Sequence, residues 1–159
     1  TLSSKGFYSI GPYKNSGPIP PKVGSDTTYT IVWSVGNTQA DIADAKVTAK
    51  LGNGVKFLSS QGIGRENVTY NEETNTLAWD MGNLSSGSGF STSGREAAFQ
   101  VVLTPTTGQV GTVPVLVSGI NFSGRDTSTA TNVSVNNSPV TTRLSNDPAF
   151  IQGDDIVVR

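Results

Sequence analysis

The sequence contains no cysteine and no histidine. The absence of cysteine excludes disulfides, thiolate nucleophiles and zinc sites with cysteine ligands. The absence of histidine excludes Ser–His and Cys–His catalytic pairs, as well as metal sites with histidine ligands. Twelve acidic residues are present, but no motif of a two-carboxylate hydrolase accompanies them. We therefore expect a protein that is not an enzyme and that needs no cofactor.

Charged residues are also scarce, at 14% of the 159 residues, and the formal net charge is −1. No basic stripe could neutralise phosphates, so we expect no nucleic-acid partner. No apolar run approaches the ~18–20 residues of a membrane span. The sequence starts at Thr1 with neither Met nor a leader, and we expect a processed chain or a part of a longer protein.

What is present is the composition of short strands and tight turns, with many Ser, Thr, Gly and Val residues. The clearest strand covers residues 27–35, where every second residue is apolar, and it stops at a Gly-Asn turn signal. A segment with four prolines, residues 11–26, precedes it and is expected to be an edge or a connection. The alanine-rich stretch that follows alternates over residues 43–51, which favours a strand over a helix.

Alternation and turn signals together predict ten short strands, at residues 5–10, 27–35, 43–51, 55–59, 67–71, 76–81, 95–104, 112–122, 127–135 and 140–144. Such a series predicts an all-β fold, an immunoglobulin-like Greek-key β-sandwich of about 7–10 strands. We expect an N-terminal strand and connecting loop in residues 1–17, the sandwich in 18–144, and a C-terminal tail or inter-domain linker in 145–159.

Three strands supply the expected core. Their inward residues are Tyr29, Ile31, Trp33 and Val35; Leu77, Trp79 and Met81; and Phe99, Val101 and Leu103. Aromatic side chains bury about 150–250 Å² each, so the two tryptophans would dominate a core of this size. The alternative is that they are exposed platforms on which sugars stack.

Residues 18–135 also resemble a known family. The residues that carry the resemblance are Gly24, Asp26, Tyr29, Gly36, Asn37, Val47, Leu51, Gly54, Val55 and Phe57, and then Leu77, Trp79, Gly82 and Leu84 in a later hairpin. They are similar to the repeat domain of unknown function that occurs in tandem in prokaryotic cell-surface proteins. The resemblance implies an immunoglobulin-like sandwich, an extracellular setting and a role as spacer, stalk or adhesion module, with no catalytic residues. One departure is Val35, where the family has asparagine, which implies a deeper core or a face that meets a neighbour.

Two kinds of modification or ligand site are candidates. Calcium prefers oxygen ligands, and Asp147, Asp154 and Asp155 are its weak candidates, since a solvated acidic turn is the simpler interpretation of them. Glu72 and Glu73 form a second acidic turn. Five Asn-x-Ser/Thr sequons are glycosylation candidates, at Asn67, Asn83, Asn121, Asn132 and Asn136.

A Lys–Asn isopeptide bond would need a buried carboxylate beside both groups. Its candidate residues are Lys5 or Lys22, Asn132, and Glu96 or Asp80.

Three functions remain open from the sequence. The first is a non-enzymatic spacer of a surface protein, with neighbouring repeats as partners. The second is an adhesin domain for surface glycans or proteins, which needs exposed aromatics such as Phe7, Tyr8, Tyr13 or Phe90. The third is a filament subunit, in which the terminal segments 5–10 or 154–159 join the sheet of an identical copy. The conservative expectation pairs the first end within the chain and the second with the next repeat.

Overall fold

The computed structural model describes residues 2–36, 40–60, 66–87 and 94–159. The elements in these ranges are ten strands and one short 3-10 turn, η1 (Thr107–Gln109). The strands are β1 (Leu2–Phe7), β2 (Thr27–Val35), β3 (Ile42–Leu51), β4 (Val55–Ser59), β5 (Val68–Asn71), β6 (Thr76–Leu84), β7 (Arg95–Leu103), β8 (Val115–Asp126), β9 (Thr131–Asn137) and β10 (Val140–Thr141).

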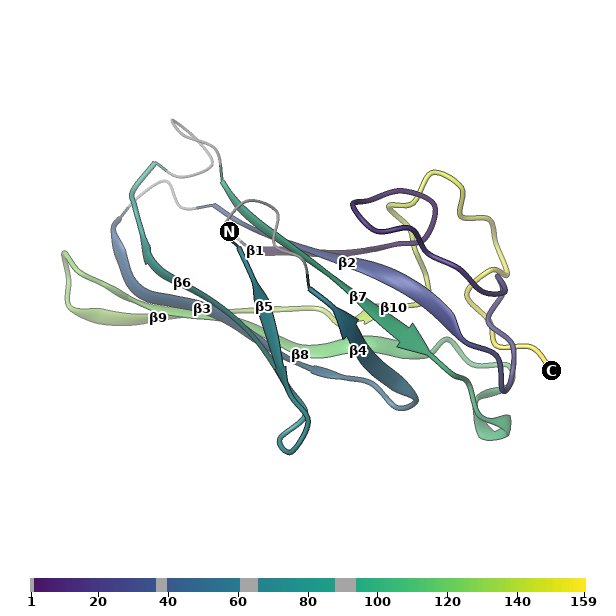
Figure 1. Ribbon diagram of the computed structural model, residues 1–159. Coiled ribbons are helices and arrows are strands. Elements are labelled where there is room, and N and C mark those ends of the chain that lie inside the picture. The colour runs from purple at the N-terminus through teal and green to yellow at the C-terminus, as the bar shows by residue number, and fades with distance from the viewer. Residues whose placement is uncertain (1, 37–39, 61–65, 88–93) are drawn as a thin grey trace.

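The strands form two antiparallel sheets that pack face to face (Figure 1). One sheet has four strands in the order β1-β2-β7-β4. The other has six, in the order β10-β8-β3-β6-β5, with β9 also paired to the long strand β8. Because the chain crosses repeatedly from one sheet to the other, each sheet contains strands that are distant in sequence. The fold is the predicted immunoglobulin-like sandwich.

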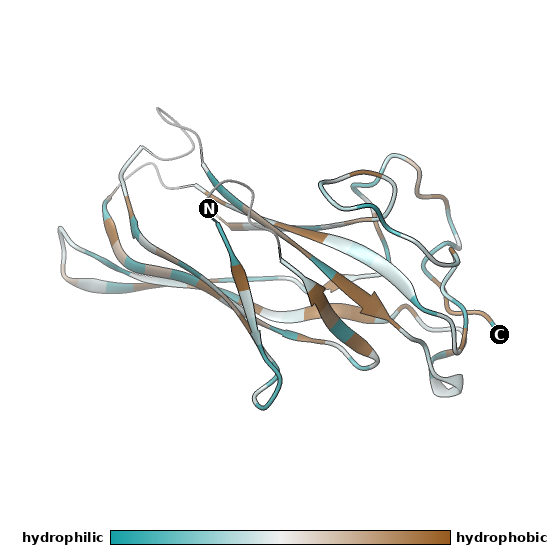
Figure 2. Cartoon of the chain, in the orientation of Figure 1, coloured by the Kyte–Doolittle hydropathy of each residue, from teal (hydrophilic) through white to brown (hydrophobic). Residues whose placement is uncertain are grey.

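The inner faces of the two sheets form one apolar core. All the inward residues predicted on β2, β6 and β7 are buried. Trp33 and Trp79 are fully buried, and the Trp33 ring meets the edge of Phe99 with ring centroids 4.9 Å apart. The core prediction is confirmed, and the sugar-platform alternative is wrong. Figure 2 shows the hydrophobic colour along the strands, while the β5–β6 turn is hydrophilic.

The residue that departs from the family pattern lies in this core. Val35 is buried at the end of β2, next to the start of β1 in the sheet. This favours the deeper core over a face that meets a neighbour. The alanine-rich stretch is strand β3, as predicted.

Three strand predictions need correction, and one of them is the last strand, which covers only Val140–Thr141 and not 140–144. The first strand is β1, residues 2–7 and not 5–10, because residues 8 and 9 leave the sheet and donate their N–H groups to a carboxylate in the tail. The stretch 123–126 is not a turn but the end of β8. The turn follows it, since the Asp126 carboxylate accepts hydrogen bonds from the N–H groups of Ser128 and Thr129, and Ala130 takes a left-handed conformation.

The proline-rich segment, residues 11–26, is a connection that crosses the outer face of the four-stranded sheet. Ser16 accepts a hydrogen bond from the N–H of the β2 residue Thr28 and donates its own N–H to the Thr28 hydroxyl. The Asn15 side chain binds the hydroxyl of Thr30, and Gln100 of β7 binds both Asn15 and the carbonyl of Lys14. These contacts bury polar side chains on the outer face of β2 and β7, which simple alternation would leave in water.

Candidate functional site

The C-terminal tail, residues 145–159, is the region most relevant to how this chain could connect to others. It leaves β10 and folds back along the sandwich, where its end lies next to the proline-rich segment (Figure 1). Three contacts hold it: the carboxylates of Asp147 and Asp155, and the backbone of Val157 and Val158. The sequence suggested a tail or linker here and did not indicate any of these contacts.

Asp147 is buried and ties the tail to the N-terminal strand. Its carboxylate accepts hydrogen bonds from the N–H groups of Tyr8 and Ser9, both at 2.7 Å, from the Ser9 hydroxyl, and from the N–H of Ala149 at 2.9 Å. Burial by itself would raise the pKa of this carboxyl, but the four hydrogen bonds outweigh burial and hold the pKa below its ordinary value. The contact therefore depends on an ionised carboxylate.

Asp155 makes the second contact, with the residues that follow β10. Its carboxylate pairs with the Arg143 guanidinium at 2.8 Å, and its carbonyl accepts from the hydroxyl of Thr142 at 2.7 Å. The Asp155 side chain is buried, whereas that of Arg143 is largely exposed. The carboxylate of Asp154 binds the N–H of Ile151 within the tail.

The last contact is a backbone clamp around Val157 and Val158. Val158 donates its N–H to the carbonyl of Pro21 and accepts from the N–H of Val23, at 2.9 and 3.0 Å. On the other side, Val157 donates to the carbonyl of Thr112 and accepts from Gly111, at 3.0 and 2.9 Å. The C-terminal end is therefore paired within its own chain, and the expectation that it pairs with the next repeat is wrong for these residues.

The N-terminal strand enters the sandwich at a distance from this clamp. Leu2 lies opposite Val35, the last residue of β2, whereas the clamp holds Lys22, which precedes the first residue of β2. Nine residues of strand rise about 30 Å, so Leu2 lies about this far from the end of β2 that follows the clamped segment. Figure 1 shows the two termini apart in the same way. As the conservative expectation had it, β1 pairs with the chain's own sheet.

Asp147 and Asp154 line one small pocket, but the three calcium candidates of the tail do not form a metal-binding group among the described residues. Asp147, Asp154 and Asp155 each have the separate protein partners given above, and Glu72 and Glu73 are exposed in the β5–β6 turn. In the part of the chain that the structure describes, no group of three or more acidic, histidine or cysteine residues is placed to hold a metal ion. These separate contacts give calcium binding by the tail no support, and a melting curve with and without the ion is needed to test it.

The isopeptide candidates do not come together either. Lys5, Lys22, Asn132, Glu96 and Asp80 are all exposed, whereas the bond needs a buried carboxylate. The geometry therefore gives this hypothesis no support.

The aromatics required by an adhesin are not exposed where they can be described. Phe7, Tyr8 and Tyr13 are half-buried, and the hydroxyls of the two tyrosines bind backbone carbonyls. Phe90 lies outside the described residues.

Four of the five sequon asparagines are exposed: Asn67, Asn83, Asn132 and Asn136. Asn121 is half-buried, and its side-chain amide donates to Ser134 and Asn136 at 2.8 and 2.7 Å. Because a glycan would replace one hydrogen of that amide nitrogen, at least one of the two bonds would be lost, and Asn121 is the least suitable acceptor. Asn121, Asn132 and Asn136 lie on one face of the β8–β9 hairpin.

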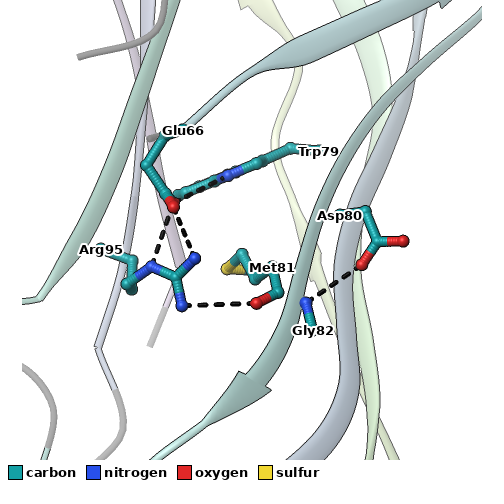
Figure 3. A network of polar contacts seen from close by, with 6 residues as sticks. All are labelled: Glu66, Trp79, Asp80, Met81, Gly82 and Arg95. Atoms are coloured by element: carbon teal, nitrogen blue, oxygen red, sulfur yellow. Dashed lines mark hydrogen bonds and ion pairs between the residues drawn. The ribbon is translucent and has the colours of Figure 1, made fainter. Parts of the chain in front are cut away.

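A polar network that sequence reasoning missed lies between the two sheets, away from the tail (Figure 3). The carboxylate of Glu66 accepts from Trp79 Nε1 at 3.0 Å and from two guanidinium nitrogens of Arg95, which also binds the carbonyl of Met81. It ties Glu66, two residues before β5, to β6 and β7. No local pattern in the sequence indicates it, because the partners are 13 and 29 residues from Glu66. All its groups are engaged with one another, so its evident role is to hold strands together.

No protein-family model matches the chain, and no curated protein matches it. Among solved structures, it is similar to domains D2 and D3 of the major pilin SpaD from Corynebacterium diphtheriae, with 12% identity, a TM-score of 0.50, and 87% of this chain and 51% of that chain covered. It also aligns with the major pilin subunit BcpA of Bacillus cereus (12% identity, TM-score 0.49, coverage 89% and 39%). A third is a non-cellulosomal cohesin from the archaeon Archaeoglobus fulgidus (14% identity, TM-score 0.42, coverage 92% and 93%).

The chain spans about half or less of the two pilin structures. At such identities the likeness to the SpaD domains concerns the fold, an immunoglobulin-like sandwich found in a surface protein. Within the described residues, no helix is both long and apolar enough to span a membrane.

Proposed function

We propose that this chain is a non-enzymatic structural module of an extracellular surface protein, and that it carries tension between its two ends. The observation that carries the proposal is that the two chain ends are held near opposite ends of β2. The N-terminal end pairs in the sheet, and the C-terminal end is held by a backbone clamp. The fold that it shares with domains of a major pilin supports a cell-surface location.

The direction of β1 suits this role. Its six residues pair antiparallel with β2, and its first residue lies on the side away from the C-terminal clamp. Ladder hydrogen bonds run perpendicular to the strands. A pull along β1 therefore loads the whole ladder at once, whereas a pull across it would break the bonds one after another.

The clamp at the other end anchors the chain on two sides. Val157 and Val158 bind both the proline-rich segment and the loop before β8 through four backbone hydrogen bonds. The buried Asp155 pairs with Arg143 immediately before this clamp. Tension applied at the C-terminus would thus pass into two separate parts of the sandwich.

Single-molecule force spectroscopy tests the proposal. The chain, placed between two marker domains and pulled through its termini, should unfold in a discrete event that releases roughly 500 Å of chain. The control attaches the pulling handle through Ile10→Cys, an exposed position just after β1, instead of through the N-terminus. Since this attachment bypasses the β1–β2 ladder, we expect a clearly lower unfolding force. Equal forces for the two attachments would contradict the proposal.

A further inference from the structure

The edge strand β9 differs from the other described edges of the sandwich. Strand edges are usually blunted by charges, proline, bulges or short length. β4 carries Lys56 and a bulge, and β5 is four residues long and leads into two glutamates. β1 carries Lys5 and lies near β10, whose Val140 side chain would be 3.0 Å from a Cβ placed on Gly6.

None of these protections is present on β9. It has seven residues, Thr131–Asn137, without charge, proline, glycine or a bulge. Among the described residues, it pairs through its backbone with β8 alone. The end of β9 lies near the start of β1, where the side chain of Asn137 donates to the carbonyl of Leu2 at 2.8 Å.

The sequence of this edge reads the same in both directions. Residues 132–136 are Asn-Val-Ser-Val-Asn, symmetric about Ser134. When two such strands pair antiparallel with Ser134 opposite its own copy, every Val faces a Val and every Asn faces an Asn. Such pairing is isologous, with one two-fold axis and a closed interface.

The exposure of the valines fits the same arrangement. Val133 and Val135 point to the core side of the sheet, where Val135 lies opposite Phe122 of β8. Val135 nevertheless remains 42% exposed. In the symmetric pair, Val133 of the second copy would lie directly across from it, and cross-strand pairs of β-branched residues stabilise sheets.

We propose that β9 is a homotypic docking edge, through which two copies of this chain join antiparallel and merge their six-stranded sheets into one continuous sheet. The ladder pairs Ser134 with Ser134, Val133 with Val135, and Asn132 with Asn136. The partner is a second copy, because the edge is complementary to itself and its lack of charge removes the repulsion that usually prevents edges from pairing. The inference is independent of the proposed mechanical role, and either can fail without the other.

Sedimentation velocity of the full chain, from about 10 μM to about 1 mM, provides the first test. We expect a reversible dimer whose fraction rises with concentration. In Ser134→Lys, two like charges would meet across the two-fold axis, and we expect dimerisation to weaken at least tenfold. The matched control is Thr69→Lys, an exposed position on β5 at the opposite edge of the same sheet, which should leave the dimer unchanged.

A charge-swap experiment separates a specific register from a general loss of folding. Ser134→Lys and Ser134→Asp should each be monomeric alone and should form a heterodimer when mixed, because position 134 opposes itself. In addition, Ser134→Cys should cross-link under mild oxidation, since directly opposed Cα atoms lie about 4.5–5.5 Å apart, within disulfide range. The chain has no other cysteine, so the product is unambiguous.

A chain that stays monomeric up to about 1 mM would overturn the proposal. So would a dimer that survives Ser134→Lys, or mixed charge variants that stay apart. A Thr69→Cys control that cross-links as fast as Ser134→Cys would do the same, because it would place the contact elsewhere.

Discussion

The two faces of strand β2 are both buried, but they are buried by different means. The inner face carries Tyr29, Ile31 and Trp33, which pack against apolar residues of the other sheet. The outer face carries Thr28 and Thr30, which are covered by the proline-rich segment and held by hydrogen bonds to it. The tail continues this polar layer near the end of β1, where Asp147 binds residues 8 and 9.

The difference teaches that the two faces of one sheet can be stabilised by different interactions, the inner face by the apolar core and the outer face by hydrogen bonds to the covering segments. Burial of the inner face removes apolar area from water, and this stabilises the folded state by roughly 25 cal/mol for each Å² of apolar surface buried. The outer layer also buries apolar side chains such as Val157, but directed hydrogen bonds hold it in addition, each with a modest net contribution of about 0.5–1.5 kcal/mol. The inner layer should therefore control global stability, and the outer layer should respond to pH and to local backbone geometry.

The largest effect should come from the inner face. Trp33→Ala removes a fully buried ring that contacts Phe99, and we expect it to lower the free energy of unfolding by about 3–5 kcal/mol, measured by urea denaturation. Trp33→Phe is the matched control. Among the described residues Nε1 of Trp33 has no hydrogen-bond partner, so the shorter ring should cost clearly less. An unchanged urea midpoint for Trp33→Ala would mean that the inner face does not control stability.

The next effect concerns the polar layer and its pH dependence. Asp147→Asn should lower stability at pH 7 by about 1.5–3 kcal/mol, because a charged acceptor of four hydrogen bonds becomes a neutral amide. The folded-state pKa of Asp147 is depressed. Its contribution is therefore complete above the unfolded pKa of about 3.9 and is lost as the pH falls through the lower folded value.

Thermal melts between pH 7 and pH 2 provide the measurement. The native chain should lose stability progressively below about pH 5, and Asp147→Asn should lack the part of this loss that belongs to Asp147. Parallel profiles for the two proteins would show that the ionised carboxylate does not hold the tail.

A smaller and more local effect is expected at Gly17, where the proline-rich segment returns toward β2. Its φ of +103° is in the region that favours glycine, and an added Cβ would lie 2.1 Å from the carbonyl oxygen of Asp26. Gly17→Ala should cost roughly 1 kcal/mol or more. Hydrogen exchange should show faster exchange at Thr28, whose N–H binds Ser16, while the amides of β3 and β6 keep their protection. Equal acceleration in all strands would argue against a separate outer layer.

The smallest effect should follow removal of divalent ions. The three tail aspartates have protein partners of their own, so we expect EDTA to leave the melting temperature unchanged. A lower melting temperature that added Ca²⁺ restores would instead identify a calcium site by mass action.

Most strands and the inward residues of β2, β6 and β7 could be predicted from the sequence. Trp33, Trp79 and Phe99 each lie in an alternating run, and a period of two specifies which residues share a face. The end of β8 could not be predicted so well. The Gly-Arg-Asp stretch carries a turn signal, but pairing with β3 and β9 on both sides keeps it extended. The Glu66–Arg95 pair was equally beyond prediction, since its partners are far apart in the chain.

The sequence by itself determined the fold class, the core and the exclusion of cysteine and histidine chemistry, because composition and periodicity are local properties. Tertiary structure decided the rest. It placed the proline-rich segment on Thr28 and Thr30, and it paired Asp147 with residues more than 130 positions away. Among the described strands, it also made β9 an edge strand that pairs with β8 and lacks the usual protection of edges. These contacts depend on how distant segments meet, and a hydrogen bond between such segments leaves no periodic trace in the order of residues.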